Sequence, residues 1–243
     1  MSFERLQWIY RAWRYRYRLE RPEIRLLLQH LAPGDVAVDV GAHKGAYTYW
    51  IRQAVGPAGK VYAFEPQPLL AERLRALVAG SHYSNIVVEN LGLSSAAGTL
   101  VLNVPDGGPS PGASFEVSGA GGQSYPVAVT TLDDYFDDDQ RRRIRLLKCD
   151  AEGHELEVFR GAHRLLTEAR PCLLFECELR HRKSGRVDDV LNWLLDLGYR
   201  GFFIDRDGAR DIGEFDVAVH QSRSGAPGYI NNFLFLPPSG PMD

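Results

Sequence analysis

Short apolar segments alternate with longer segments of helical periodicity, and this alternation restricts the fold more than any other feature of the chain. The apolar segments are VAVDV (36–40), KVYAFE (60–65), RLLKCD (145–150) and CLLFECE (172–178), and each is followed by apolar residues spaced three or four apart. Strands that are apolar throughout are covered on both faces, and the intervening amphipathic helices can supply that cover. We therefore expect an α/β fold with a mostly parallel sheet, helices on both faces and right-handed crossovers.

Two parts of the chain depart from this alternation. From Asn103 to Pro126, a segment rich in glycine, proline and serine separates the strand-like TLVLNV (99–104) from VAVTTL (127–132). It has little apolar surface to hold it in place, so we interpret it as a mobile insertion and expect it to act as a lid on the acceptor side of the site. Near the C-terminus, FFIDRDGARDI (202–212) predicts a hairpin around Asp207-Gly208, and NNFLFLP (231–237) predicts a last strand.

Arginine and aromatic residues are concentrated in residues 1–30, ahead of a single predicted domain over residues 31–243. Seven arginines fall within the first 25 residues, interleaved with tryptophan and tyrosine. Three interpretations fit this pattern: an amphipathic helix that makes peripheral contact with a membrane, an RNA-binding patch, or a helix packed on the sheet with arginine stems lying on aromatic rings. The net charge is −3, so no basic field covers the whole protein to gather nucleic acid, which makes nucleic acid a disfavoured partner.

The composition indicates a soluble protein that stays in the cytoplasm. The sequence contains no run of about 18 apolar residues, and charges occupy the place where a signal peptide would need its apolar segment. Cys149, Cys172 and Cys177 lie in predicted strands, without the spacing of a zinc site. Free buried thiols in a reducing compartment are the simplest interpretation.

The turn after the first predicted strand, Gly41-Ala42-His43-Lys44-Gly45, has the residue types of a ligand site. Glycine allows a ligand to approach the backbone closely, and ligands of open α/β sheets bind at the carboxyl ends of strands. The spacing matches neither the dinucleotide fingerprint GxGxxG nor the phosphate-binding loop GxxxxGK[ST]. Glu65 ends the second strand about 20 residues further on, the distance at which an acidic residue binds ribose hydroxyls. A nucleoside without a pyrophosphate is the ligand that this pattern indicates.

Five segments resemble the FkbM family of S-adenosylmethionine-dependent methyltransferases in order and spacing. They are VDVGAHKGAYT, AFEPQP, NLGLSSAAGTL, TTLDDYF and KCDAEGHELEVFRGA, of which the last is the most distinctive, and the likeness covers roughly residues 35 to 180. The resemblance implies a Rossmann-like class I methyltransferase fold. Such a fold has a mostly parallel seven-stranded sheet with helices on both faces and a C-terminal antiparallel strand.

The resemblance also implies which residues bind the cofactor S-adenosylmethionine. The first strand and the glycine turn surround its amino acid end, the start of the next helix covers its methionine portion, the end of the second strand binds its ribose, and the residues after the third strand lie along its adenine. In that order these residues are Asp39, Gly41, Ala42, His43 and Gly45; Tyr47 and Thr48; Glu65 and Pro66; Asn90 and Leu91. His43 departs from the family pattern, in which this turn position is often Asn.

The reaction needs an in-line approach and a nucleophile that loses its proton, because a sulfonium methyl group is already activated. A placed general base typically contributes about 10²–10⁴-fold, and a divalent cation such as Mg²⁺ held by carboxylates is the alternative. The first candidate is Asp150, at the tip of the predicted strand 145–150. Glu152 is the second and can instead fix the turn at Gly153, and His154 is the third and can instead cap a helix. Glu176 and Glu178 end the next strand, and His181 is open to the same two interpretations as His154.

The family resemblance, rather than any spacing, indicates O-methylation of a hydroxyl on a sugar, glycan or other small-molecule natural product. N-methylation stays open, although the sequence lacks the Asp/Asn-Pro-Pro-aromatic motif of enzymes that methylate base amino groups. Two alternatives come from other classes. One is an RNA-modifying or RNA-binding protein that uses the arginine and aromatic residues of the N-terminus, and the other is a methyltransferase-like protein that binds the cofactor without turnover.

Overall fold

A computed structural model describes residues 3–81, 83–105, 108–116, 122–181, 186–226 and 228–238. The α-helices are α1 (Phe3–Arg14), α2 (Arg21–Gln29), α3 (Ala46–Val55), α4 (Pro68–Ala79), α5 (Leu132–Tyr135), α6 (Asp138–Arg143), α7 (Glu155–Arg160), α8 (Val187–Asp196) and α9 (Val217–His220). Short π or 3₁₀ turns are η1 (Tyr15–Leu19), η3 (Leu165–Ala169), η4 (Leu179–His181) and η5 (Ile212–Glu214). The strands are β1 (Val36–Val40), β2 (Lys60–Phe64), β3 (Ile86–Glu89), β4 (Gly92–Leu93), β5 (Gly98–Val104), β6 (Gln123–Thr130), β7 (Ile144–Cys149), β8 (Cys172–Glu176), β9 (Arg200–Ile204), β10 (Ala209–Asp211) and β11 (Asn232–Leu236).

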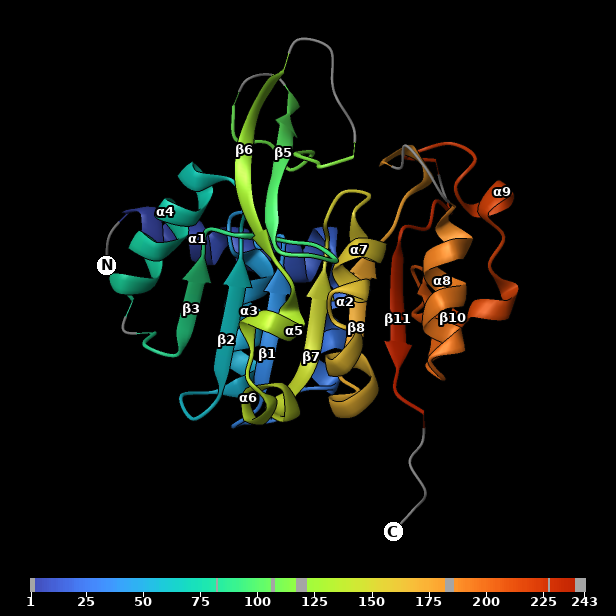
Figure 1. Ribbon diagram of the computed structural model, residues 1–243, viewed down its shortest axis with the longest axis horizontal. Coiled ribbons are helices and arrows are strands. Elements are labelled where there is room, and N and C mark those ends of the chain that lie inside the picture. The colour runs from blue at the N-terminus through green and yellow to red at the C-terminus, as the bar shows by residue number, and fades with distance from the viewer. Residues whose placement is uncertain are drawn as a thin grey trace.

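Eight strands of the described residues form one sheet in the order β10-β9-β11-β8-β7-β1-β2-β3 (Figure 1). Strands β3, β2, β1, β7 and β8 pair in parallel, and β11 runs antiparallel to both of its neighbours, β8 and β9. The predicted α/β class, with a mostly parallel sheet and a C-terminal antiparallel strand, is confirmed.

The expected number of seven strands is wrong for this chain, because β10 adds an edge strand to the sheet. The predicted hairpin at Asp207-Gly208 is present: β10 pairs antiparallel with β9, and the Asp205 N–H donates to the Gly208 carbonyl. The Asp205 carboxylate also accepts from the N–H groups of Asp207 and Gly208. The aspartate thus fixes a tight turn, which lets the chain pair with itself beyond the seventh strand.

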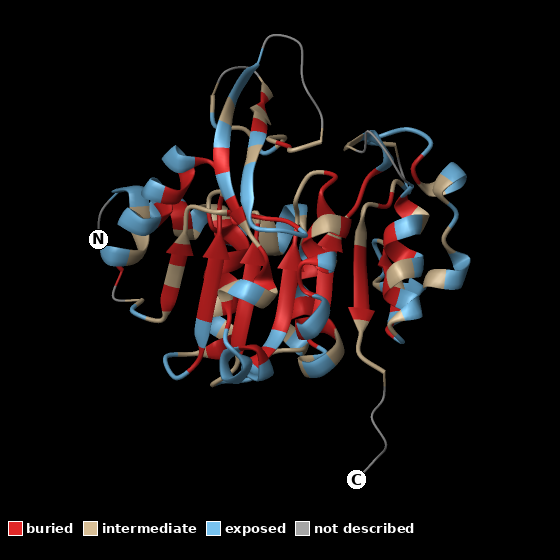
Figure 2. Ribbon diagram, viewed as in Figure 1, coloured by how far each residue is buried: buried red, intermediate tan, exposed pale blue. Residues whose placement is uncertain are grey.

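Helices cover both faces of the sheet, so the central strands are buried throughout (Figure 2). Alternate residues of β1 point to opposite faces: Val36, Val38 and Val40 pack with residues of α7 and α8, whereas Ala37 packs with residues of α1, α2 and α3. Two hydrophobic cores therefore lie on either side of one sheet, as the apolar strands predicted.

The N-terminal segment packs on the second of these cores through one of its faces. Trp8 and Ala12 are fully buried, and the Trp8 Nε1–H donates to the Gly45 carbonyl at 2.8 Å. The guanidinium of Arg16 lies over the ring of Trp50, 4.2 Å from its centroid. This is the packing expected of a helix with arginine stems on aromatic rings, although other aromatic residues of the segment stay exposed. No helix among the described residues is long and apolar enough to cross a lipid bilayer.

Strands β4, β6 and β5 form a separate small sheet that projects beyond the carboxyl ends of the main strands (Figure 1). The expected limits of the insertion, Asn103 and Pro126, lie inside β5 and β6, because Asn103 pairs with Ser124 and Val101 with Pro126. Residues 106, 107 and 117–121 of the insertion lie outside the described residues. Residues 108–116 run back over the carboxyl ends of β2 and β7, where the candidate site lies.

Candidate functional site

A cavity of about 430 Å³ lies at the carboxyl ends of β1, β2, β7 and β8. The strand order reverses at β1, which has β2 and β3 on one side and β7 and β8 on the other. Ligands of open α/β sheets bind where the strand order reverses, so the cavity occupies the expected position. The predicted site residues that line it are Gly41, Ala42, His43, Tyr47, Glu65, Pro66, Leu91, Asp150 and Glu152. Those that do not are Asp39, Gly45, Thr48, Asn90 and His154.

The glycine turn is held in a backbone conformation that requires its glycines. Gly41 has φ +69°, and a Cβ there would lie 1.9 Å from the Asp150 carbonyl oxygen. Gly45 has φ +73°, and a Cβ there would lie 2.5 Å from Leu74. His43 also adopts a left-handed conformation, with φ +48°. Asn tolerates this conformation better than most residues, which explains why it is common at this turn position in the family that the sequence resembles.

Glu65 is clamped against the glycine turn by backbone hydrogen bonds. One carboxylate oxygen accepts from the His43 N–H at 2.7 Å and the other from the Gln67 N–H at 2.9 Å. Burial raises the pKa of Glu65 to about 7, although both hydrogen bonds oppose the shift. Asn90 lies behind this wall and donates to the carbonyls of Glu65 and Pro66. The arrangement holds a carboxylate rigidly at the cavity wall, where it can accept hydrogen bonds from a diol.

Asp39 and Thr48 form a buried support beneath the cavity instead of lining it. The Thr48 hydroxyl donates to Asp39 at 2.6 Å, and the Lys148 ammonium lies 3.6 Å from a carboxylate oxygen of Asp39 and 3.6 Å from one of Asp150. Burial alone would lower the pKa of Lys148, but the charges of Asp150 and Asp39 raise it above its usual value. Lys148 is therefore a fixed cation that ties the end of β7 to the end of β1.

The N-terminal segment supplies one end of the cavity, which sequence reasoning missed. Arg11, Tyr15 and Glu20 line the cavity, and the Tyr47 hydroxyl donates a short hydrogen bond to Glu20. Burial raises the pKa of Tyr47 well above its usual value, so the phenol keeps its proton. One sequence signal was available: Pro22 suits the first turn of a helix, which indicates that a new helix begins there and that Glu20 lies at the turn before it.

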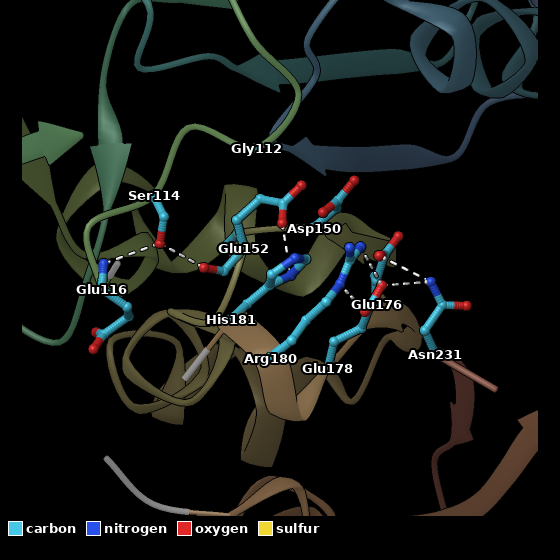
Figure 3. A network of polar contacts seen from close by, with 12 residues as sticks. Gly112, Ser114, Glu116, Asp150, Glu152, Glu176, Glu178, Arg180, His181 and Asn231 are labelled. Atoms are coloured by element: carbon cyan, nitrogen blue, oxygen red, sulfur yellow. Dashed lines mark hydrogen bonds and ion pairs between the residues drawn. The ribbon is translucent and has the colours of Figure 1, made fainter. Parts of the chain in front are cut away.

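The far end of the cavity carries a carboxylate–imidazole pair (Figure 3). Glu152 Oε2 lies 2.7 Å from His181 Nδ1. Burial would lower the pKa of His181, but the hydrogen bond and charge of Glu152 raise it above its usual value. Gly153 makes this pairing possible, because a Cβ at that position would lie 2.1 Å from the His181 carbonyl oxygen. His181 is thus a cavity residue, whereas its position in the sequence left its role open.

Two carboxylates, Glu176 and Glu178, lie at the end of β8, beside the Glu152–His181 pair (Figure 3). Asn231 donates to Glu176 and to Glu178, at 2.9 Å each (Figure 3). The Tyr229 hydroxyl donates to Glu178 at 2.7 Å. Burial, together with the neighbouring charge of Asp150, raises the pKa of Glu176 well above its usual value. Burial would raise the pKa of Glu178 too, but hydrogen bonds from Glu176, Arg180 and Tyr229 lower it. We infer a neutral Glu176 beside an ionised Glu178.

These acidic groups match the ligand preference of Mg²⁺ poorly. Among the described residues, Glu176, Glu178 and His181 bring one potential ligand atom each within 4.8 Å of one another. Mg²⁺ prefers oxygen ligands in octahedral geometry, but one of these three is an imidazole, and Glu178 is already bound by Arg180, Tyr229 and Asn231. The arrangement gives no support to the expected Mg²⁺, and no step of the reaction is assigned to it.

His154, the third catalytic candidate from the sequence, lies outside the cavity and has both ring nitrogens engaged. Nε2 lies 2.9 Å from the Ser94 hydroxyl, and Nδ1 lies 2.7 Å from a carboxylate oxygen of Glu116. The ring also packs against Phe115, with 5.3 Å between centroids. This geometry favours a structural role, in which His154 holds the insertion in place.

The described part of the insertion is attached over the cavity at two further points. The Gln67 side chain exchanges two hydrogen bonds with the backbone of Ser110, at 2.9 and 3.0 Å. The Ser114 hydroxyl donates to the Glu152 carbonyl at 2.6 Å (Figure 3). The insertion thus spans from Gln67, beside Glu65, to Glu152, which contacts His181.

Similarity to known proteins covers most of this structure. The sequence model of the methyltransferase FkbM domain family matches residues 39–200 of this chain. The chain is 31% identical over 160 residues to the hexuronic acid methyltransferase AglP of Haloferax volcanii, covering 64% of this chain and 62% of AglP. It is 31% identical over 166 residues to the methyltransferase sdnD of Sordaria araneosa, covering 55% of this chain and 62% of sdnD. The alignments therefore span less than two thirds of either relative.

Two solved structures share the fold at low sequence identity. The methyltransferase FkbM from Methylobacillus flagellatus KT matches with a TM-score of 0.53 and 18% identity, covering 97% of this chain and 55% of that one. A Streptococcus mutans protein solved in complex with SAH matches with a TM-score of 0.53 and 14% identity, covering 90% of this chain and 98% of that one. At these identities the likeness shows the fold alone, which is that of class I methyltransferases.

Proposed function

The chain belongs to the FkbM methyltransferase family, and we propose that it transfers a methyl group from S-adenosylmethionine to a hydroxyl of a sugar, glycan or other small natural product. One observation carries the proposal: a single cavity has a glycine turn and a clamped carboxylate at one end and a carboxylate–imidazole pair at the other. The similarity to a hexuronic acid methyltransferase supports a sugar as the acceptor.

The residues that line the cavity would hold the cofactor with its amino acid end toward the N-terminal segment. Glu65 would accept hydrogen bonds from its ribose diol, and Leu91 and Leu93 would form the apolar wall along its adenine. Its carboxylate and ammonium groups need a cation and an acceptor, and Arg11 and Glu20 place both types at the same end of the cavity. Held in this way, the cofactor would offer its methyl group to an acceptor near Asp150 and the Glu152–His181 pair.

Proton removal is assigned to His181, with Glu152 as the group that orients it. Because Glu152 faces Nδ1, that nitrogen carries the proton of the neutral ring, and Nε2 keeps the lone pair that accepts a proton. The bound cofactor would supply a methyl group already activated by its sulfonium, which leaves the residues of the chain to position the acceptor and to remove its proton. The hydroxyl proton passes to His181, and Asp150 accepts a hydrogen bond that aims the acceptor at the methyl group.

The direct test of this activity is transfer of a labelled methyl group to a panel of hexuronic acids, neutral sugars and hydroxylated natural products, with mass spectrometry to locate the product ether. We expect at least one acceptor to be methylated on oxygen, at the same rate in Mg²⁺ and in EDTA. Binding of S-adenosylhomocysteine without transfer to any acceptor would instead identify a non-catalytic binding protein.

Cofactor affinity is expected to depend on Glu65 and on pH. An ionised carboxylate that accepts from two ribose hydroxyls is worth roughly 1.5–3 kcal/mol, so Glu65→Ala should weaken S-adenosylhomocysteine binding at least tenfold. The pKa of Glu65 is raised to about 7 in the free protein, and bound ribose stabilises the ionised form. Below pH 7 binding must therefore release a proton, and affinity falls as pH falls, by up to about tenfold per pH unit.

Calorimetric titration between pH 5.5 and pH 8.5 checks this expectation, with Glu65→Gln as the control that cannot titrate. The wild-type affinity should decline below about pH 7, whereas that of Glu65→Gln should stay low and flat. A wild-type affinity that is independent of pH and unchanged in Glu65→Ala would remove Glu65 from the cofactor site.

The insertion is proposed to act as an acceptor-side lid, and its anchors can be removed without deleting it. Ser114→Ala combined with Glu116→Gln should lower turnover by about tenfold to a hundredfold, because small displacements of a positioning element carry costs of that order. Cofactor affinity should change little, since Ser110 and Gln67 keep their hydrogen bonds. Ser124→Ala is the control, because it removes an exposed hydrogen bond of the same hairpin away from the cavity. Equal turnover in both variants would make the segment a passive loop.

A further inference from the structure

One face of the N-terminal segment presents a continuous row of large apolar side chains to solvent. Phe3, Leu6, Tyr10, Trp13 and Tyr17 follow one another three or four residues apart, which places them along one side of α1 and η1. Their exposed fractions lie between 48% and 73%, and the rings of Trp13 and Tyr17 are stacked. We call this row the aromatic stripe. An apolar row of this length on a surface helix indicates an interaction site more than ordinary surface composition.

Exposed arginines accompany the aromatic stripe: Arg14 and Arg18 directly follow Trp13 and Tyr17 on α1 and η1, and two more follow the turn at Glu20 on α2. We call these four residues the arginine row. Arg14, Arg18, Arg21 and Arg25 are exposed, and within the part of the chain that the structure describes none of them forms an ion pair. The protein as a whole carries a net charge of −3, so these cations are concentrated on a molecule that is otherwise acidic. The segment is therefore the part of the surface to which an anionic partner is drawn, and it fixes the orientation of the approach.

We propose that the aromatic stripe and its arginine row dock the protein on the surface of an anionic lipid bilayer. Helices that lie in the membrane interface combine an apolar face with arginine on the adjoining polar face. Tyrosine and tryptophan suit this depth, because the ring enters the apolar region while the hydroxyl or indole N–H stays among the headgroups. Arginine in turn pairs with lipid phosphates.

The same observations fit other partners less well. Two copies of the chain that met through their stripes would bring two arginine rows together, and Glu4 is the one acidic residue exposed on α1 and η1. Single-stranded RNA would stack on the aromatic rings, but Leu6 and Leu19, each 50% exposed, have no ring for a base to stack on. A bilayer satisfies the aliphatic, aromatic and cationic groups together.

Docking through this face would leave the catalytic domain attached and correctly folded. Trp8 and Ala12, on the opposite side of α1, are fully buried, and the Trp50 Nε1–H donates to the Ala12 carbonyl at 2.7 Å. Arg11 and Tyr15 of the same segment line the cavity, so the cavity would lie about one helix diameter, ~10 Å, from the headgroups. Acceptors held at a membrane surface would then be within reach.

Vesicle co-sedimentation with the full chain tests the proposal. We expect binding to vesicles of phosphatidylcholine mixed with phosphatidylglycerol and at least about tenfold weaker binding to phosphatidylcholine alone, with added salt weakening the former. Leu6→Ser with Tyr10→Ser, and separately Arg14→Gln with Arg18→Gln, should each weaken binding to the mixed vesicles by about tenfold or more. The matched control is Val101→Ser with Val219→Ser, which removes exposed apolar residues elsewhere and should bind as the wild type does.

Thermal unfolding and transfer to a soluble acceptor should be unchanged in the Leu6/Tyr10 variant and in the Arg14/Arg18 variant. The replaced side chains lie outside the cavity and outside the cores. No binding to the mixed vesicles, equal binding to both lipids, or equal losses in the control would each overturn the proposal. Salt-dependent binding of single-stranded RNA without vesicle binding would assign the face to nucleic acid. A dimer in solution that is abolished by Leu6→Ser with Tyr10→Ser would assign it to a second copy.

Discussion

His181→Ala is expected to lower methyl transfer by about 10²–10⁴-fold while cofactor affinity stays at the wild-type level. The imidazole lines the cavity, and the 2.7 Å contact between Glu152 and Nδ1 leaves Nε2 to accept the proton in the proposed reaction. Transfer measured at saturating cofactor checks the rate, and calorimetry with S-adenosylhomocysteine checks the affinity. His163→Ala is the matched control, because His163 is exposed and packs against Trp193 on the surface.

The pH profile separates a proton acceptor from a structural histidine. A general base must be neutral, so the wild-type rate should rise with pH through the pKa of His181, which Glu152 raises above its usual value, and then level off. Glu152→Gln removes the charge that raises this pKa and should shift the acidic limb of the profile to lower pH. A folded His181→Ala protein with near-normal transfer would exclude His181 as the base and return the assignment to Asp150 or Glu152.

The sheet and the end of the cavity that contains the glycine turn and Glu65 could be predicted because they depend on local sequence. Apolar strands followed by helical periodicity determine a covered parallel sheet, and a residue directly after such a strand must lie at its carboxyl edge. Glu65 and Asp150 were located by that argument alone, and both line the cavity. The glycine turn was found in the same way, since its conformations exclude side chains at Gly41 and Gly45.

The alternation of side chains along β1 predicts the direction of the Asp39 side chain, and the family resemblance alone does not. Val36, Val38 and Val40 face one core, so Asp39 must share the face of Ala37, which α3 covers. Parity therefore places the Asp39 side chain beneath the helix with Thr48, where the structure has it, and not among the residues that line the cavity. A strand residue can be important to a site while its side chain supports the site from behind.

The residues that sequence reasoning missed come together only through long-range packing. Arg11 and Glu20 reach the cavity because α1 and η1 cross α3 and the chain then turns into α2. His181 meets Glu152 because η4 packs against Gly153, and His154 is occupied because the distant insertion brings Glu116 to it. No local pattern specifies these contacts, so their positions had to come from the structure.

Asp150→Asn is the second change with a large expected effect, and it should lower transfer by about a hundredfold or more while cofactor binding survives. The Asp150 side chain is 31% exposed at the cavity, and one carboxylate oxygen lies 3.6 Å from Lys148. Asparagine keeps the shape of the side chain but loses the negative charge. That charge strengthens the hydrogen bond accepted from the hydroxyl of the methyl acceptor and balances the charge of Lys148. Lys148 keeps Asp39 as an ionic partner, 3.6 Å away, so the fold should persist.

Asp39→Asn supplies the contrast that gives the Asp150 result its meaning. Asp39 is fully buried and lines no part of the cavity, so its replacement removes a buried partner of Lys148 and should lower the free energy of unfolding. Turnover per folded molecule should fall far less than in Asp150→Asn, because the charge at the cavity surface is retained. Both variants should be assayed with Mg²⁺ and with EDTA, and the wild-type rate should be equal in the two. Near-normal transfer by folded Asp150→Asn would show that this carboxylate acts as an ionic partner of Lys148 and does not contact the methyl acceptor.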